Sequence, residues 1–189
     1  VAVSQYAQVR SIRLLFYVEN KNNSSMYILA YHSIQVQRVF TATDVASFGC
    51  LVGDNNPLHQ TWNFDKLPQE LKSHPLLKDL KATDRTDDKT KVMVHGMLAS
   101  SLFSCIFGTL VPGSVYLKQT LDFKSPVYVD EPVIGRVDIV RVRDFSRKIG
   151  GVIVSCDTRI SPVATDSGDD CVVGKADVWL PSGSKAKAR

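Results

Sequence analysis

The sequence predicts an α+β fold, in which several antiparallel strands follow one long buried helix. Residues 96–110 (GMLASSLFSCIFGTL) are apolar nearly all round, which is typical of a helix enclosed by other elements, and the segment ends near Pro112. The chain has 189 residues, of which 44% are hydrophobic, so it is long enough for one ordinary core. Four later segments alternate apolar and polar residues as strands do, at residues 115–123, 133–142, 152–160 and 172–180.

Before the long helix we expect one strand and one short helix. Residues 34–40 (IQVQRVF) alternate as in a strand. Thr43 and Asp44 then offer a helix cap, and the helix should end at Gly53. Its short apolar face is formed by Val45, Phe48 and Leu51.

Three segments are predicted to lie outside the compact domain, to which we assign residues 34–181. Residues 1–33 have weak periodicity and a loop signal (KNNSS), so we expect an amino-terminal extension. Residues 65–91 hold seven Lys/Arg and six Asp/Glu with few aliphatics, which is typical of a solvated loop, with one short helix near residues 68–72. Residues 182–189 form a basic tail.

In the strand that follows the long helix, Val115, Leu117, Leu121 and Phe123 are expected on one face and Tyr116 on the other. Alternation is looser over the next segment and regular in the last two. Small residues of the helix should let the surrounding sheet approach closely, namely Ala99, Ser100, Ser101, Ser104, Cys105 and Gly108.

Charge and cysteine usage exclude several classes of function. The net charge of +4 belongs to the ends of the chain, and no basic stripe interleaved with aromatics favours nucleic-acid binding. The four cysteines form no CxxC pair and have no histidine at zinc-ligand spacing, so we expect reduced, mostly buried thiols and no metal site. No apolar run approaches eighteen residues, so we expect a soluble protein without a membrane span.

The segment GDNNPLH, residues 53–59, places an acid and a base in one loop. Asp54 and His59 are five residues apart across Pro57, a spacing too irregular for one helix face, so both side chains should project from a bent loop into a common space. Such a pair can hold a water molecule and share proton transfers. Considered alone, Asp54 could equally be a turn residue beside Gly53, and His59 an ordinary surface imidazole.

The segment VHGMLASSLFS, residues 94–104, offers an oxyanion site. Gly96 begins the apolar helix, where the first N–H groups are free to bind a carbonyl oxygen and the helix dipole favours negative charge. Gly96 also permits tight helix entry, and both roles are compatible. His95 is a candidate third catalytic group, although a structural role is the favoured interpretation.

Taken with the downstream block PGSVYLKQTLDFKSPVYVDEPV, these motifs resemble the MaoC-like, hot-dog-fold family of (R)-specific enoyl-CoA hydratases and 3-hydroxyacyl thioester dehydratases. The resemblance covers about residues 40–180, with the three blocks in order. It implies a sheet wrapped around the long helix and a hydro-lyase acting in fatty-acid metabolism. The family usually has Ser where this chain has Val52, just before the glycine and aspartate of the first block.

The resemblance implies the roles of individual residues. Asp54 and His59 would transfer protons to and from a water molecule, and the N–H of Gly96 would bind the thioester oxygen. Asn56 would support the loop through its side-chain amide. Ser104 would line the site, although a plain packing role is equally open.

The resemblance also implies the substrate and partners. The acyl chain would be carried on coenzyme A or on the phosphopantetheine of acyl carrier protein, with no further cofactor, and the chain would form a homodimer. Residues 1–18 contain Arg10, Arg13, Ser4 and Ser11 but no acid, which is typical of mitochondrial transit peptides and suggests a matrix location. A processed amino terminus packed on the domain is the alternative.

Two other functions remain open. A hot-dog thioesterase would share the fold, but the GDNNPLH block argues against it. A catalytically silent subunit, acting as a scaffold or acyl-carrier-binding module in a larger mitochondrial assembly, is the non-enzymatic alternative.

Overall fold

The computed structural model describes residues 9–18, 27–54, 56–60, 69, 92–110, 112–145, 150–163 and 169–181. The predicted tail at residues 182–189 lies outside this set, as does the loop at residues 65–91 with its short helix, apart from residue 69. The elements are β1 (Val9–Val18), β2 (Tyr27–Val39), α1 (Ala42–Val52), the 3₁₀-helix η1 (Pro57–His59), α4 (Gly96–Leu110), β3 (Val115–Phe123), β4 (Pro132–Asp144), β5 (Val152–Pro162) and β6 (Val172–Leu180).

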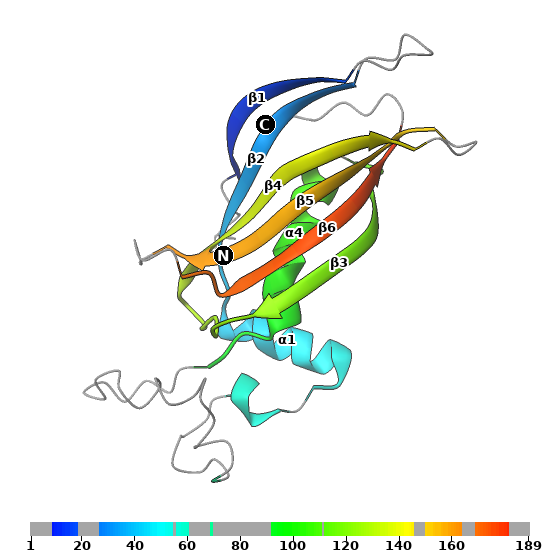
Figure 1. Ribbon diagram of the computed structural model, residues 1–189. Helices are drawn as coiled ribbons and strands as arrows, with labels where there is room; N and C mark the ends of the chain where they lie inside the picture. Colours follow the sequence, from blue (N-terminus) through cyan, green and yellow to red (C-terminus); the bar gives the residue numbers. More distant parts are fainter. Residues whose placement is uncertain are drawn as a thin grey trace, which may run out of the picture.

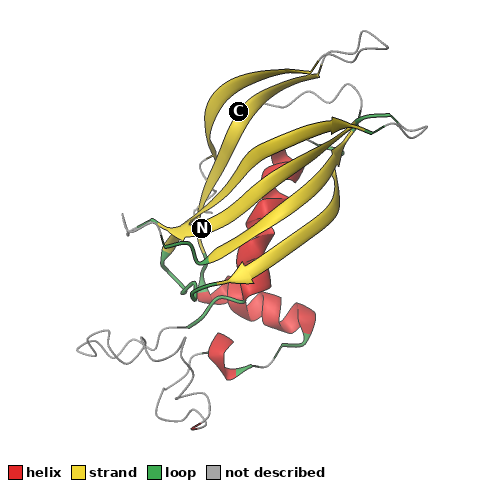
Figure 2. Ribbon diagram, in the orientation of Figure 1, coloured by secondary structure: helices red, strands yellow, loops and turns green. Residues whose placement is uncertain are grey.

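The strands form one antiparallel sheet in the order β1-β2-β4-β5-β6-β3. The sheet curves over α4, which lies against one of its faces, with α1 beside the lower end of α4 (Figure 1). Figure 2 shows the same division into one strand layer and a helical layer. The predicted α+β fold is therefore confirmed, with the long helix where the sequence placed it.

The amino-terminal part differs from the prediction. The domain boundary expected between residues 33 and 34 falls inside β2, which begins at Tyr27 and pairs with β1 on one side and with β4 on the other. The β1–β2 pairing has register shifts at Ile12/Arg13 and again before Phe16. Each shift interrupts the two-residue period of a strand, which explains the weak periodicity.

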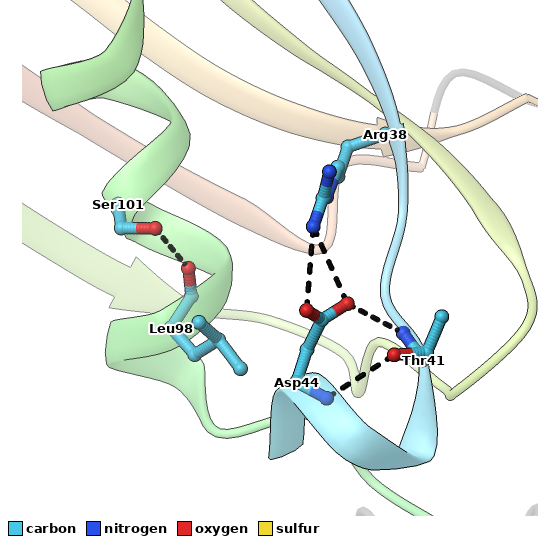
Figure 3. Close-up of polar contacts among 5 residues, drawn as sticks. All are labelled: Arg38, Thr41, Asp44, Leu98 and Ser101. Carbon is cyan, nitrogen blue, oxygen red and sulfur yellow. Dashed lines mark hydrogen bonds and ion pairs between the residues drawn. The ribbon is translucent and has the colours of Figure 1, made fainter. Parts of the chain in front are cut away.

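Helix α1 begins two residues earlier than predicted. Its N-cap is Thr41, not Thr43: the Thr41 hydroxyl accepts the N–H of Asp44, and the Asp44 carboxylate accepts the N–H of Thr41 (Figure 3). Arg38 forms an ion pair with the same carboxylate at 3.3 Å. This reciprocal arrangement satisfies two N–H groups that would otherwise lack partners at the helix start.

Helix α4 has the predicted bounds, but it is covered on one side only. Phe103 and Ile106 are almost fully buried in the core, and α4 approaches β4 so closely that a Cβ on Gly135 would lie 3.0 Å from the Cβ of Leu102. Met97 is 60% exposed. Most of the small residues lie on the exposed side rather than against the sheet, namely Ser101, Ser104, Cys105 and Gly108.

The strands after α4 follow the predicted pattern except in β3. A register shift between Tyr116 and Lys118 reverses the faces there: Tyr116 is partly buried while Leu117 is half exposed. A second shift between Ile139 and Arg141 accounts for the looser alternation of β4. In β5 and β6 the alternation is regular, as predicted, and its apolar positions are buried, for example Val154 and Val178.

The four cysteines are free thiols, as predicted, but only half of them are buried. Cys156 and Cys171 lie in the core, where burial raises the pKa of the Cys156 thiol to about 12, while Cys50 and Cys105 are exposed. Among the described residues, no helix is long and apolar enough to cross a membrane.

Candidate active site

The carboxylate of Asp54 is positioned by the end of α1. Gly53 adopts a left-handed conformation with φ of 75°, which stops the helix and turns the chain. The N–H of Asp54 then donates to the carbonyl of Gly49 at 3.0 Å, and the N–H of Asn56 donates to Oδ1 of Asp54 at 2.9 Å. One carboxylate oxygen is therefore held by the loop, which leaves Oδ2 free for other groups.

The imidazole of His59 is positioned by η1. The side chain of Asn56, which we expect to support the loop, caps this turn: its Oδ1 accepts the N–H of Leu58 at 3.1 Å. The Nδ1 of His59 lies 2.9 Å from the carbonyl oxygen of Met93. Because a carbonyl only accepts, Nδ1 carries the proton, and the lone pair of the neutral ring is on Nε2.

Nε2 of His59 faces Oδ2 of Asp54 at 3.9 Å. This separation is about 1 Å too long for a direct hydrogen bond. A water molecule hydrogen-bonded to both atoms would span about 4.4 Å, so a small movement admits one between them. The structure thus brings together the two residues of the predicted pair, with the geometry of two groups that share one water.

Gly96 lies beside this pair because the preceding residues are fixed on two sides. Met93 N–H donates to the carbonyl of Leu58 at 3.1 Å, and Val94 N–H donates to the carbonyl of Val127 at 2.8 Å. The N–H of Gly96 has no acceptor among the described residues. The ring of Phe123 lies over Gly96 so closely that a Cβ there would be 2.5 Å from a ring carbon. Only glycine fits without a shift.

His95, for which the sequence favours a structural role, lies directly against the Asp54 and His59 pair. Its side chain is only 5% exposed, and Nε2 lies 3.6 Å from Oδ2 of Asp54. Its ring is stacked on that of His59, with centroids 3.8 Å apart, and tilted against Phe48 at 5.0 Å. Burial, followed by the charge of His59, lowers the pKa of His95 despite the opposing effect of Asp54. The sequence offers no signal for this placement beyond adjacency to Gly96.

Ser104 is not brought to this pair. It lies eight residues after Gly96, which is about 12 Å along a helix axis, and it is exposed. Its neighbour is Tyr116, whose pKa is raised mainly by burial and lowered in part by Ser104. A hollow of about 430 Å³ between β3, β5 and β6, lined among others by Thr120, also lies apart from Asp54 and His59.

Asp54, His59 and His95 supply the residue types of a two-histidine, one-carboxylate metal site, with ligand atoms within 4.8 Å of one another. The lone pair of a ring nitrogen lies in the ring plane. The two rings are stacked with an interplanar angle of only 27°, so their lone pairs do not converge on one ion. This geometry favours proton transfer over metal binding, and the prediction of no metal stays a prediction.

Comparisons with known proteins agree with these observations. No family model matches the chain. The mitochondrial 3-hydroxyacyl-[acyl-carrier-protein] dehydratase of Solanum lycopersicum is 32% identical over 168 residues, which are 88% of this chain and 86% of that protein. The (R)-specific enoyl-CoA hydratase of Aeromonas caviae is 34% identical over 149 residues, 78% of this chain and 91% of that protein.

Solved structures give the same result. The (R)-hydratase from A. caviae involved in PHA biosynthesis superposes with a TM-score of 0.56 at 33% identity, over 79% of this chain and 94% of that one. A MaoC-like dehydratase from Rhodospirillum rubrum, at 12% identity, shares the fold with a TM-score of 0.53 over 79% of this chain and 90% of that one. The predicted hot-dog fold and the predicted relation to hydro-lyases are confirmed.

Proposed function

This chain belongs to the MaoC-like family of (R)-specific enoyl-CoA hydratases and 3-hydroxyacyl thioester dehydratases, and from that membership we propose that it interconverts (R)-3-hydroxyacyl and trans-2-enoyl thioesters. The observation that carries this proposal is the placement of Asp54 and His59. Their side chains face each other at 3.9 Å, beside the N–H of Gly96, which has no acceptor among the described residues.

In the hydration direction the pair makes two proton transfers. One residue takes a proton from the water as its oxygen bonds to C3, and the other delivers a proton to C2, so the elements of water are added across the double bond. Dehydration is the reverse. The pair must hold one transferable proton in total, since one partner acts as the base and the other as the acid. The rate should therefore follow a bell-shaped pH profile.

The N–H of Gly96 would stabilise the negative charge that develops on the thioester oxygen. Addition at C3 makes the thioester an enolate, whose oxygen needs a hydrogen-bond donor. The N-terminus of α4 supplies an unpaired N–H and the positive end of a fifteen-residue helix. One such donor contributes about 3 kcal/mol to transition-state stabilisation.

The test is hydration of crotonyl-CoA, followed by loss of enoyl absorbance with chiral analysis of the product. We expect (R)-3-hydroxybutyryl-CoA from the wild type, and a rate lowered by about 10²- to 10⁴-fold in Asp54→Asn or His59→Gln. Asp44→Asn is the matched control, because it makes the same change at the opposite end of α1. It should retain activity.

Absence of turnover by the wild type with short and long enoyl-CoA and with enoyl carrier-protein substrates would contradict the proposal. The scaffold function would then be favoured. A biological role that survives in the doubly substituted Asp54→Asn/His59→Gln protein would support that scaffold function directly.

For the carrier and location, we favour acyl carrier protein in the mitochondrial matrix. The support is the S. lycopersicum relative, whose name gives both an acyl-carrier-protein substrate and a mitochondrial location. Comparison of kcat/KM for crotonyl-CoA and the crotonyl carrier protein tests the carrier. Recovery of the endogenous protein only from cytosolic fractions would contradict the location.

A second copy of the chain is the partner we expect. β3 is the last strand in the sheet order, so one of its edges is unpaired among the described strands, and Val115 and Leu117 on it are about half exposed. The exposed side of α4 carries Met97 and small residues. Both features suit a homodimer that joins two sheets, which sedimentation analysis would detect.

A further inference from the structure

We propose that His95 is a positioning residue of this site, whose Nε2–H donates a hydrogen bond to Oδ2 of Asp54 and holds that carboxylate toward the water shared with His59. The inference rests on the dehydratase chemistry proposed above and adds a third side chain to it.

The first argument is the lack of any other partner for a buried polar ring. Neither ring nitrogen of His95 has a hydrogen-bond partner among the described residues, although the side chain is only 5% exposed. A buried polar atom without a partner is unfavourable, so native structures seldom contain one. The acceptor in place is Oδ2 of Asp54 at 3.6 Å, and a movement of about 0.7 Å would make a normal hydrogen bond.

The second argument is the state of the carboxylate. Oδ1 of Asp54 already accepts the N–H of Asn56, while Oδ2 faces both imidazoles. Neutral His59 presents a lone pair there, because its proton is held at Nδ1 by Met93. In that form His59 offers Oδ2 no donor, and in its protonated form it gives up the Nε2 proton during the reaction. A donor that stays in place must come from another residue, and His95 is the neighbour that can provide one.

The third argument is charge. The titratable groups that act on His95 are His59 from η1 and Asp54 from the loop after α1. A second imidazolium stacked 3.8 Å from a protonated His59 would be repelled, and burial also disfavours it. His95 therefore remains neutral while His59 gains and loses its proton. A neutral N–H donor holds Asp54 in place without competing for the transferred proton.

The ring of His95 is packed between residues of α1. Phe48 lies against one side of it, and Gly49 lies beside another, where a Cβ would be at an ordinary contact distance of 3.6 Å from Nε2 of His95. If His95 were only a packing group, a phenyl ring of similar shape should serve equally well. Replacement of His95 by phenylalanine therefore distinguishes a packing role from a hydrogen-bonding role.

The experiment compares His95→Phe, which keeps an aromatic ring without a donor, with His95→Gln, whose amide can place an N–H near the position of Nε2. Rates of crotonyl-CoA hydration are measured from about pH 5 to pH 9, with thermal unfolding alongside. A lost hydrogen bond to a charged group corresponds to a fall in kcat of about ten- to a hundredfold. We expect that fall in His95→Phe, with KM unchanged.

The pH–rate profile distinguishes the two roles, because loss of a packing contact alone would leave the position of its acid limb unchanged. A carboxylate that has lost a donor is protonated more easily, so the acid limb of His95→Phe should shift to higher pH. His95→Gln should recover most of kcat and return the limb toward the wild-type position. Phe48→Leu is the control, because it alters packing on the same ring without removing a polar group. It should leave the limb in place.

Either of two results would overturn the inference: a wild-type rate and limb in His95→Phe, or an equal loss in both His95 variants with an unshifted limb. A wild type without activity would instead contradict the proposed dehydratase function. Should His95→Phe fail to fold, nitrogen NMR of the wild type decides the matter, since we expect the His95 proton on Nε2. A proton on Nδ1 would exclude the hydrogen bond.

Discussion

Substitution of Gly96 by alanine separates the catalytic contribution of this residue from its structural one. The added Cβ would lie 2.5, 2.8 and 3.0 Å from three carbon atoms of the Phe123 ring, where a normal carbon contact is about 3.5 to 4.0 Å. The ring must therefore move by about 1 Å. Because Phe123 is 48% exposed, it has room to do so.

The expected effect on stability is small, because two contributions oppose each other. Overpacking costs about 1 to 3 kcal/mol, and the lower value applies where a ring can move toward solvent. Alanine is better than glycine in a helix by about 1 kcal/mol. The net loss should lie between about 0 and 2 kcal/mol, which lowers Tm by at most several degrees in a chain of this size.

The expected effect on catalysis is large. The methyl group and the displaced ring occupy the space beside the N–H that would bind the thioester oxygen. Loss of one such donor lowers kcat by about 10²- to 10³-fold. Steady-state hydration of crotonyl-CoA and a thermal melt of the same sample measure both quantities. In Gly96→Ala, kcat should therefore fall far more than Tm.

A double-substitution cycle with Phe123→Ala identifies the cause. If the ring is what blocks the site, Gly96→Ala/Phe123→Ala should recover part of the activity lost in Gly96→Ala. Two results would refute the reasoning. One is a wild-type kcat in Gly96→Ala. The other is a fall in Tm large enough for unfolding alone to explain the lost rate at the assay temperature.

Two further predictions concern stability. Thr41→Ala removes the N-cap of α1 and should cost about 1 kcal/mol, or about 2 to 4 °C in Tm. Its kcat should stay at the wild-type value, because the whole length of α1, about 16 Å, separates Thr41 from Asp54, and a fall in kcat would contradict this. The lowered pKa of His95 means that the unfolded chain binds a proton there which the folded chain does not, so the free energy of unfolding should decrease as pH falls below about 6.5. Denaturant titrations of wild type and His95→Phe at several pH values should show a smaller decrease in the variant, and equal slopes would exclude His95 as the cause.

Much of the fold could be predicted because apolar patterns and end signals lie in the sequence itself. Helix α4 has the predicted bounds, since glycine, proline and an apolar run mark it without ambiguity. The cap of α1 was placed at Thr43, although Thr41 is followed three residues later by Asp44, the spacing of a capping box. That signal was present and would have identified Thr41.

The errors in the strands have a common physical origin. A register shift inverts which side chains face the core, and it leaves no reliable mark in the residue types. In β3 the shift after Tyr116 turned Leu117 outward, and in β1 two shifts concealed the strand altogether. Pairing between backbones, as between β2 and β4, does not need an alternating pattern.

Prediction of the site from the sequence has a similar limit, because contacts between distant residues leave no mark in the residue types. Asp54, His59 and Gly96 could be found from motifs, because each lies where the chain must bend or a helix must start. Ser104 could have been placed away from them by arithmetic, since eight helical residues extend about 12 Å. His95 could not have been assigned from sequence, because its significance depends on the ring stacked against it and on the carboxylate 3.6 Å away.

The two motifs form one unit because of contacts made by Met93. Its N–H donates to the carbonyl of Leu58, and its own carbonyl accepts Nδ1–H of His59. The same residue thus fixes the position of η1 and the tautomer of the imidazole, two residues before His95 and three before Gly96. Distance along the sequence between the motifs does not enter this arrangement. The site depends instead on two backbone hydrogen bonds of Met93, one to Leu58 and one to His59. The side chain of Met93 takes no part in either bond.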